Sequence, residues 1–579
     1  MTNKLKVSTE YAAATILSLA ILACVMQLWR ADLRVPFTYT GDALLYGIAT
    51  KGAIEEGWWL HNSSLGAPTG LKYEAYPAIE NFHFLLIKLI SIFSSDYALT
   101  LNLYYLLTFP LTAITSLYFF KYFKFSFGSA LFGSLLFTFL PYHFFRSYHL
   151  FLAAYYMVPL MILVILWVCS GKPFLVQFGD NKRWPRLEFK SYESVFSIVV
   201  CVIVGSCGLY YPFFSCFLLL IAGANTCVQR KKIAALLAPA ILVGILAGTV
   251  FINHLPLAIY QYTHGSSGLG QRSVVDAEVM GFKITQLLLP IGGHRWMPLR
   301  ALKYRYNLGP LVNENDTASL GFVGSIGFLI LLGRLFSRKV NRSLIDDLSL
   351  LNLSALLLAT IGGFGVLFAI FISPQIRAYN RISVFIAFFS LVAVTQIVEV
   401  LYKTLKRRGP KFYFACIGAL IVVVGILDQT SDIHFFVPEY ERIKTEYQAD
   451  ADFINQLEAT LPPRSMVFQL PYIPFPESPG AYKLNDHEPL KAYLHSKSLR
   501  WSYGAIAGQE DDIWQRSVAA KPTAEFVQDI SRAGFKGIYL NRDGYADNGA
   551  AIEADLRTIV GTKPIVNRRR NLVFYNLRN

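Results

Sequence analysis

The chain has 579 residues and a net charge of +15, and 54% of its residues are hydrophobic while 16% are charged. Its mean hydropathy of +0.41 is too high for a soluble multidomain protein, because repeated apolar runs have the length of a membrane-spanning helix. The basic residues fall mostly in short links between these runs, a pattern that orients a membrane protein. We expect no nucleic-acid partner, because no basic patch interleaved with aromatic residues accompanies them.

The apolar runs predict a polytopic α-helical membrane protein of about eleven spans. They lie near residues 11–29, 97–119, 127–142, 152–170, 194–209, 212–229, 233–253, 318–334, 349–372, 383–402 and 412–428. The basic links alternate with these spans so that residue 1 is cytoplasmic and the chain after residue 429 lies outside. The links include Lys4, Lys6, Lys121, Lys124, Lys182, Arg183, Arg338, Lys339 and the runs 230–232 and 406–408. Residues 1–428 are therefore predicted to form a transmembrane domain.

Three regions on the outer side stand out by their length: the loop 30–96, the loop 254–317 and the tail 429–579. In the first loop, the apolar stretch 84–94 is too short to span and predicts a helix lying in the membrane interface. The tail changes composition sharply. Strand patterns at 465–470, 537–540 and 571–577 alternate with helical patterns at 523–533 and 550–560, which predicts a separate extracytoplasmic α/β domain.

Asp42 stands just past the first apolar run and is preceded by Gly41. A carboxylate at the mouth of a membrane helix costs free energy, so it is a functional-site candidate. A reaction that deprotonates a hydroxyl needs a general base beside the hydroxyl oxygen, and a shielded carboxylate with a raised pKa suits that role. The alternative is that Thr40 or Asp42 caps a helix over residues 43–54, and the two interpretations are compatible.

The first loop holds four further carboxylates, Glu55, Glu56, Glu74 and Glu80. Glu74 is a second catalytic candidate, whereas Glu55 and Glu56 are expected to be solvated. Glu80 receives no assignment from its sequence context.

Three groups of cationic residues are predicted on the same outer side, where the positive-inside bias disfavours them. The three-residue steps of the first group and the four-residue step of the second put each group near one helical face. An anionic ligand would account for them, because arginine pairs bidentately with phosphate, and the alternative is snorkelling toward lipid headgroups. The groups are His143, Arg146 and His149; Arg377 and Arg381; and Arg295, Arg300, Lys303 and Arg305.

Metal binding has weak support. The histidines and acids available to bind an ion show no diagnostic spacing. These are Asp42, Glu74, His83, His143 and His149. The sequence therefore names no metal site and no certain cofactor, and leaves a divalent cation open. In the tail, the run 486–488 holds an acid, a histidine and an acid, which a polar loop explains equally well.

The layout resembles the GT-C superfamily of integral-membrane glycosyltransferases and, more narrowly, bacterial YfhO-like proteins. Gly41 and Asp42 open a long first outer loop, Arg377 and Arg381 precede a late span, and residues 526–540 show the helix–strand pattern of the tail. The DxD or ExD pair of the superfamily is absent, because Thr40 stands two positions before Asp42.

This resemblance implies transfer of a sugar from a polyprenyl-phosphate donor to a cell-envelope glycan or lipid acceptor, at the outer face of the bacterial cytoplasmic membrane. Asp42 would be the general base, and a clamp for the donor phosphate would come from Arg377, Arg381, Arg146 and Arg295. The expected substrate-binding residues are His83, His143, His149, Tyr379, Asn380, Trp58 and Trp59, whose aromatic members could stack on sugar faces or anchor the chain at the interface.

Two alternatives remain open: a transporter or flippase for lipid-linked saccharides, and a noncatalytic envelope assembly protein. Transporters place charge near the bilayer midplane, with broken helices and repeated halves. Here the ionisable residues gather at one mouth of the predicted bundle and no internal repeat is evident, which favours the enzyme.

Overall fold

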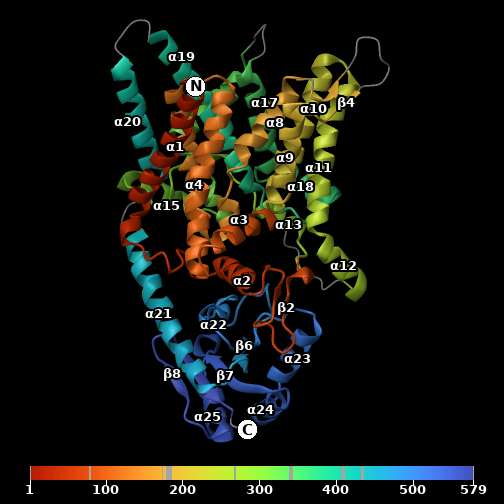
Figure 1. Ribbon diagram of the computed structural model, residues 1–579, viewed down its shortest axis with the longest axis vertical. Helices are drawn as coiled ribbons and strands as arrows, with labels where there is room; N and C mark the ends of the chain where they lie inside the picture. Colours follow the sequence, from red (N-terminus) through yellow and green to blue (C-terminus); the bar gives the residue numbers. More distant parts are fainter. Residues whose placement is uncertain are drawn as a thin grey trace.

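A computed structural model describes residues 2–76, 80–172, 174–177, 186–265, 269–337, 343–405, 411–431 and 436–577. A bundle of long helices carries the N-terminus at one end, and a smaller α/β unit with the C-terminus lies beyond the other end (Figure 1). Several of the basic residues that predict the orientation lie outside the described residues: Lys182, Arg183, Arg338, Lys339 and the run 406–408.

Seven helical segments among the described residues are long and apolar enough to cross a membrane. They are Leu5–Met26, Tyr97–Tyr122, Phe127–Phe145, Ser147–Cys169, Tyr210–Arg230, Ile233–Asn253 and Tyr379–Thr404. Shorter apolar helices cover Asn81–Ser91, Tyr192–Gly205, Gly321–Arg334 and Cys416–Gln429. The helices of the bundle are α1 (Thr2–Met26), α4 (Tyr97–Tyr122), α5 (Phe127–Thr138), α8 (Val158–Cys169), α9 (Tyr192–Gly205), α10 (Tyr210–Arg230), α11 (Leu237–Asn253), α16 (Gly321–Arg334), α17 (Leu344–Ala359), α18 (Phe364–Phe371), α19 (Ser383–Leu405) and α20 (Lys411–Gln429).

The apolar run 349–372, predicted as one span, is divided between α17 and the eight-residue helix α18. Gly362 between them has a φ of +74°, a left-handed conformation that glycine adopts without strain. The backbone of Phe282 pairs with the turn: its N–H donates to the carbonyl of Ala359 at 3.0 Å, and its carbonyl accepts from Ile361 N–H at 3.0 Å. A hydropathy count does not detect this break, because the residues around the turn are as apolar as those of a helix.

The first outer loop packs between the bundle and the tail (Figure 1). It forms α2 (Asp42–Glu55), the short pair β1 (His61–Asn62) and β2 (Leu71–Lys72), and α3 (Asn81–Ser91). The ammonium group of Lys51 in α2 donates to the carbonyl of Tyr493 in the tail at 2.6 Å. Ala67 N–H donates to Trp501 O at 2.9 Å, and Trp501 N–H donates to Ser64 O at 2.8 Å, so this loop covers the edge of a tail strand.

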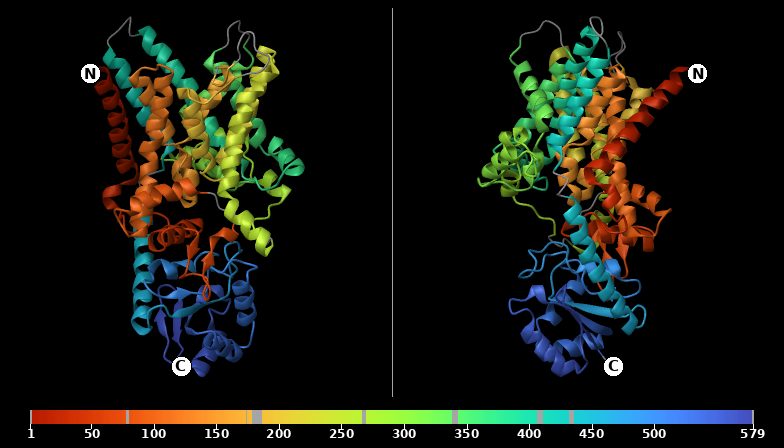
Figure 2. Two further views of the ribbon diagram at one scale, coloured as in Figure 1. Left: turned by 45° about the vertical axis from the view of Figure 1, so that its right-hand side comes forward. Right: turned by 90° about the vertical axis from the view of Figure 1, so that its left-hand side faces the viewer.

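The tail begins with a 25-residue helix, α21 (Phe436–Thr460), which runs from the bundle along the α/β unit (Figure 2). The sheet behind it has the order β6-β5-β7-β9-β8, with β5 parallel to β6 and β7, and β9 antiparallel to β7 and β8. An element lies at each of the five positions that the sequence predicts. The tail elements after α21 are β5 (Met466–Leu470), α22 (Leu490–His495), β6 (Arg500–Trp501), α23 (Glu510–Ala519), α24 (Thr523–Arg532), β7 (Phe535–Asn541), α25 (Ala550–Val560), β8 (Ile565–Asn567) and β9 (Leu572–Asn576).

The second outer loop contains short helices that return the chain to the same end of the bundle. They are α12 (Leu255–His264), α13 (Val274–Val279), α14 (Ile284–Leu288), α15 (Met297–Asn307) and the 3-10 turn η5 (Glu314–Ala318). Two further 3-10 turns, η3 (Ser147–His149) and η6 (Tyr379–Ile382), and the short helices α6 (Pro141–Phe145) and α7 (Leu150–Ala153), complete this end. The turns η3 and η6 and the helix α7 contribute residues to the cavity described next.

Candidate functional site

A cavity of about 310 Å³ lies where the first outer loop, the second outer loop and the ends of α7, α10 and α19 meet. It is at the end of the bundle that faces the tail, where Figure 1 shows α2, α3 and α13. Its charged and aromatic lining residues are Asp42, Tyr46, Trp59, Tyr73, Tyr76, Glu80, Phe84, His149, Phe151, Tyr210, Arg272, Arg377 and Arg381. The structure thus brings together the acid of the first loop and two of the predicted arginines.

Asp42 is the first residue of α2, and two histidines contact its carboxylate. Oδ2 lies 2.8 Å from Nε2 of His149, and Oδ1 lies 3.6 Å from Nε2 of His487 in the tail. Burial alone would raise the pKa of Asp42, but the hydrogen bonds from the two histidines outweigh it and hold the pKa well below its usual range. The raised pKa expected from the sequence is therefore not found, and Asp42 is an ionised carboxylate.

The start of α2 explains how Asp42 reaches these partners. Gly41 is the N-cap residue, with a φ of +55° and no side chain to cap the helix, and neither Thr40 nor Asp42 caps it. The Asp42 side chain is consequently free to point into the cavity. Helix α2 covers residues 42–55, one residue longer at each end than the predicted 43–54.

Glu314, in η5, joins two of the predicted arginines. Arg146 donates from Nη1 to Glu314 Oε2 at 2.6 Å, and Arg381 donates from Nε to Oε1 at 3.2 Å and from Nη2 to Oε2 at 3.1 Å. Asn380 closes the group by accepting from Arg146 Nη2 at 2.9 Å and donating to Glu314 Oε1 at 3.0 Å. Arg146 is completely buried. It therefore holds Glu314, and through it Arg381, while Arg381 lines the cavity and lies 4.1 Å from the centre of the Tyr210 ring.

Two further guanidinium groups line the cavity. Arg377 has one distant ion-pair partner, Asp276 at 3.9 Å, and is one-third exposed. Arg272 is paired with Glu477 of the tail, its Nη2 lying 2.5 Å from Oε1, and the Tyr76 hydroxyl donates to the same oxygen at 3.1 Å. Of the three cavity arginines, Arg377 is the most available to a ligand, because the other two already have close carboxylate partners.

The second acid of the cavity is Glu80, not the predicted Glu74. Glu74 lies outside the cavity lining, with Oε1 3.5 Å from Nε2 of His61. Glu80 precedes α3 and lines the cavity with Asp42. Burial, and secondly the charge of Asp42, raise the pKa of Glu80 to about 8 against the opposing effect of Arg381. Glu55 and Glu56 are exposed, as expected.

The predicted helical face of His143, Arg146 and His149 does not exist, because α6 ends at Phe145 and the turn η3 follows. His143 points into the core, where its ring stacks on Phe109 with centroids 3.6 Å apart. Only His149 of the three lines the cavity.

Of the remaining predicted substrate-binding residues, one lines the cavity and the others lie outside its lining. His83 is buried, with Nδ1 2.6 Å from the Tyr104 hydroxyl, and Tyr379 packs edge-on against Phe213. Asn380 serves the Glu314 group described above. Trp59 lines the cavity and stacks on Phe84, whereas Trp58 is half-buried outside the lining.

The third basic group lies away from the cavity. Arg295 donates to Leu427 O and Thr430 Oγ1 at the end of α20, and Arg300 donates to His294 O. Lys303 is buried against Asp316. Arg295 is therefore placed to fix the second outer loop to α20, and not beside the other arginines.

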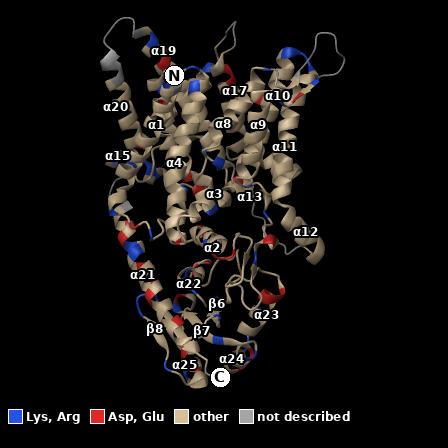
Figure 3. Cartoon of the chain, viewed as in Figure 1, with Lys and Arg blue, Asp and Glu red and all other residues tan. Residues whose placement is uncertain are grey.

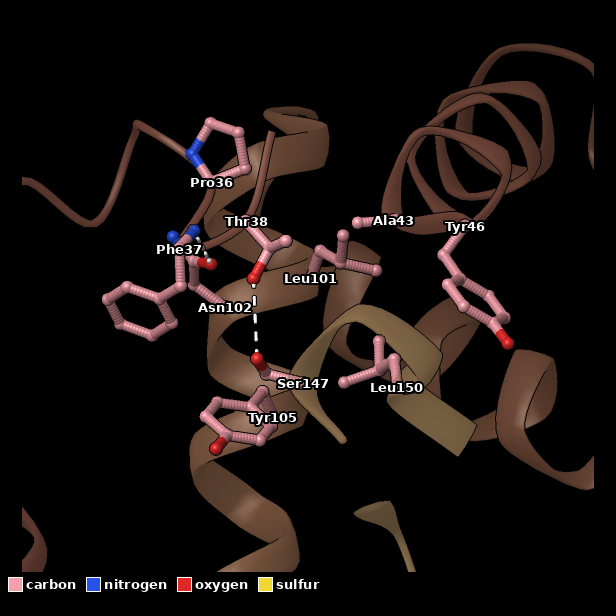
Figure 4. A pocket seen from close by; sticks show the side chains of 10 residues that line it. All are labelled: Pro36, Phe37, Thr38, Ala43, Tyr46, Leu101, Asn102, Tyr105, Ser147 and Leu150. Carbon is pink, nitrogen blue, oxygen red and sulfur yellow. Dashed lines mark hydrogen bonds between the residues drawn. The ribbon is translucent and has the colours of Figure 1, made fainter. Parts of the chain in front are cut away.

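A second cavity of about 20 Å³ shares Tyr46 with the first (Figure 4). Its polar side chains include Thr38 and Ser147, whose hydroxyls are 3.5 Å apart. This volume holds roughly one water molecule. Within the described ranges, no group of three or more His, Cys, Asp or Glu side chains is arranged to hold a metal ion.

Sequence reasoning missed four residues of this site: Glu80, Arg272, Glu314 and His487. The acid–histidine–acid run of the tail was a signal for His487. The other three lie in long loops, and no local pattern distinguishes them from solvated charges.

The arrangement has a definite chemical capacity. An ionised carboxylate and a second carboxyl share one cavity with guanidinium groups, and aromatic rings line the rest. Such a cavity can bind an anionic group at the arginines, and the ionised carboxylate of Asp42 can accept a hydrogen bond from a hydroxyl.

No family model matches the chain, and no curated protein matches it. Several solved structures are similar to it, and three of them are described here. ArnT from Cupriavidus metallidurans, bound to undecaprenyl phosphate, is 12% identical with a TM-score of 0.49, covering 97% of this chain and 98% of its own. The oligosaccharyltransferase AglB from Archaeoglobus fulgidus, in complex with an inhibitory peptide and a dolichol-phosphate, is 10% identical and has a TM-score of 0.45. The match covers 92% of this chain and 69% of AglB. Arabinofuranosyltransferase AftD from Mycobacteria is 12% identical and has a TM-score of 0.46. The match covers 98% of this chain and 40% of AftD.

Proposed function

We propose that the protein is a membrane glycosyltransferase, which moves a sugar from a polyprenyl-phosphate donor to a glycan or lipid acceptor of the cell envelope. The observation that carries this proposal is the shared cavity of Asp42, Arg377 and Arg381 at one end of a bundle of apolar helices. The lipid chain of such a donor stays in the bilayer while its phosphate and sugar lie at the membrane surface. A cavity at the end of membrane-spanning helices lies at the same depth as these groups.

The charge distribution supports an extracytoplasmic site in a cytoplasmic membrane. Helix α10 begins at the cavity with Tyr210 and ends at the basic run 230–232, so this run lies at the opposite end of the bundle. Lys121 contacts Glu10 at 2.8 Å, which puts the end of α4 beside the first helix. Figure 3 likewise has Lys and Arg at the bundle end that carries the N-terminus. By the positive-inside rule this end is cytoplasmic and the cavity faces outward.

In the proposed reaction the arginines and the carboxylate of the cavity have different tasks. Arg377 and Arg381 bind the donor phosphate and stabilise the charge that develops on it as the sugar leaves. Asp42 accepts the proton of the acceptor hydroxyl while its oxygen attacks the anomeric carbon. Trp59, Tyr73 and Tyr76 offer aromatic surface to the sugar.

The test is a comparison of Asp42→Asn with Asp32→Asn, a matched control whose carboxylate lies outside the cavity and contacts Lys444. Transfer from a panel of polyprenyl-phosphate sugars is measured with the protein in vesicles, together with binding of polyprenyl phosphate. We expect Asp42→Asn to lose roughly 10²–10⁴-fold in kcat and to retain binding. Unchanged transfer would remove Asp42 from the mechanism, and movement of an intact lipid-linked sugar between leaflets would favour a flippase.

The phosphate clamp has its own test. Arg377→Ala should weaken binding of polyprenyl phosphate by roughly tenfold or more, because hydrogen bonds to charged groups contribute about 1.5–3 kcal/mol. Arg305→Ala, an exposed arginine of α15 outside the cavity lining, should leave binding unchanged. Equal affinities for the two variants would exclude Arg377 from the clamp.

A further inference from the structure

We propose that Glu80 is a second catalytic residue of this cavity, and that its protonated carboxyl donates a hydrogen bond to the phosphate of the departing polyprenyl carrier. This inference rests on the proposed function and adds a hydrogen-bond donor to the charged clamp. It assigns different tasks to the two acids of the cavity, Asp42 as an ionised base and Glu80 as a neutral donor.

The surroundings of Glu80 differ from those of the other partly buried acids near the site. Glu314 and Glu477 each accept close hydrogen bonds from arginine, and Glu74 contacts His61. No described residue donates a hydrogen bond or forms an ion pair with the Glu80 side chain. It lines the cavity next to Gly208, where a β-carbon would lie 3.9 Å from its Oε1. A polar group in that position is left for a ligand to satisfy.

The charged and titratable groups that face Glu80 come from each of the elements around it. Asp42 and Tyr46 face it from α2, Tyr73 from the first outer loop, Tyr104 from α4, Cys207 from the turn before α10, and Arg381 from η6. Burial and the Asp42 charge raise the pKa of Glu80, whereas Arg381 lowers it, and the result is about 8. At pH 7 the carboxyl is mostly protonated, while Asp42 is ionised. Two acids whose environments separate their pKa values in this way commonly perform different steps.

The transfer step balances with these assignments. The acceptor O–H bond breaks, its proton goes to Asp42, and its oxygen forms a bond to the anomeric carbon. The bond between that carbon and the phosphate oxygen breaks, and the electron pair stays on the phosphate. Glu80 keeps its proton and shares it in a hydrogen bond to this phosphate, which strengthens as negative charge develops there.

An ionised Glu80 would repel the phosphate, so ionisation of Glu80 should weaken the binding of polyprenyl phosphate as the pH rises through 8. A phosphate monoester also titrates near pH 6, and this effect is common to every variant. Glu80→Gln keeps an N–H donor and cannot ionise, so it isolates the contribution of Glu80. Glu74→Gln removes an equivalent charge six residues away, outside the cavity, and is the matched control.

The experiment measures the affinity of the purified protein in lipid nanodiscs for polyprenyl phosphate between pH 7 and 9. Relative to Glu80→Gln, the wild type and Glu74→Gln should lose about tenfold in affinity over this range, since a group with a pKa of about 8 passes from nine-tenths to one-tenth protonated. Glu80→Ala should bind more weakly than Glu80→Gln at pH 7. Thermal unfolding of each variant identifies any loss of folding.

Transfer assays give a second, independent readout. Glu80→Gln should retain activity within about threefold of the wild type at pH 7, and its kcat should not fall above pH 8 as that of the wild type does. A wild-type rate that rises through pH 8, with Glu80→Gln inactive, would make Glu80 a base and overturn the proposal. Identical pH dependence of binding in the wild type and Glu80→Gln would overturn it as well. The proposed function fails by a different result, namely no binding of polyprenyl phosphate by any variant, or no sugar transfer by the wild type.

Discussion

Nε2 of His149 lies 2.8 Å from Oδ2 of Asp42, and this contact decides the charge of the acid at the centre of the cavity. His149 belongs to the bundle, whereas the second partner, His487, comes from the tail and lies farther away at 3.6 Å. Without these donors, burial would dominate and raise the pKa of Asp42.

The first prediction concerns this pair. His149→Leu should raise the pKa of Asp42, so that kcat falls as the pH drops below 7, whereas the wild type stays active down to lower pH. His149→Gln retains an N–H donor and should resemble the wild type more closely. Measurement of kcat between pH 5 and 8 tests this, and a profile for His149→Leu that matches the wild type would show that His149 does not set the charge of Asp42.

The second prediction concerns the stability that Glu314 contributes. The carboxylate lies against the completely buried Arg146, and removal of one partner from a buried ion pair costs about 3–5 kcal/mol. Glu314→Gln should therefore unfold at a markedly lower temperature than the wild type. Glu441→Gln, at an exposed acid of α21, should change stability by less than about 1 kcal/mol.

The same carboxylate predicts the direction of pH dependence. Burial opposes ionisation of Glu314, but Arg381 and Arg146 outweigh it and lower its pKa well below the usual range. The unfolded chain then binds more protons than the folded protein at acid pH, so this contribution is complete above about pH 5 and is lost as the pH falls further. The free energy of unfolding should fall less between pH 7 and pH 4 in Glu314→Gln than in the wild type. Equal decreases in the two proteins would show that Glu314 does not cause this pH dependence.

The third prediction concerns the backbone before Asp42. Gly41 has a φ of +55° and a ψ of −142°, a conformation that costs a residue with a β-carbon about 1–3 kcal/mol. No atom lies within 4 Å of an added β-carbon, so Gly41→Ala would act through conformation alone. It should lower both stability and kcat, because Asp42 would move from its histidine partners. Gly128→Ala, at an open position within helix α5, should be neutral or slightly stabilising. If Gly41→Ala were as active as Gly128→Ala, the positive φ of Gly41 would not be needed to position Asp42.

Parts of this site followed from the sequence because membrane geometry constrains where charge can lie. The sequence places three of the cavity residues beside apolar runs on the outer side: Asp42, Arg377 and Arg381. Charged residues on one side of a helix bundle are confined to the same membrane surface, so they lie close together. The tail elements were recognisable because strand and helix periods differ over five or more residues.

Other parts depended on tertiary structure. A three-residue spacing puts His143 and His149 on one face only if the helix continues, and α6 ends between them. Glu314 and Arg272 lie in a 64-residue loop whose path is determined by contacts with distant segments, such as Glu477 and Asn380. The choice between Glu74 and Glu80 also depended on tertiary structure, because Glu80 lines the cavity and Glu74 does not.

The last prediction concerns how the tail is held against the site. Lys51 of α2 is buried, and its ammonium group donates to the carbonyls of Tyr493, Leu494 and Ser496 at the end of α22. A cation at the C-terminal end of a helix is favourable, and these carbonyls lose their donor in Lys51→Met.

We expect Lys51→Met to lower the free energy of unfolding by about 1–3 kcal/mol. It should also increase hydrogen exchange in residues 490–496 more than elsewhere. Because α22 follows directly after the segment that holds His487, the contact with Asp42 should weaken and kcat should fall. The exposed Lys72→Met is the matched control from the same loop. Equal exchange rates in the two variants would show that α22 is held by its apolar contacts and not by Lys51.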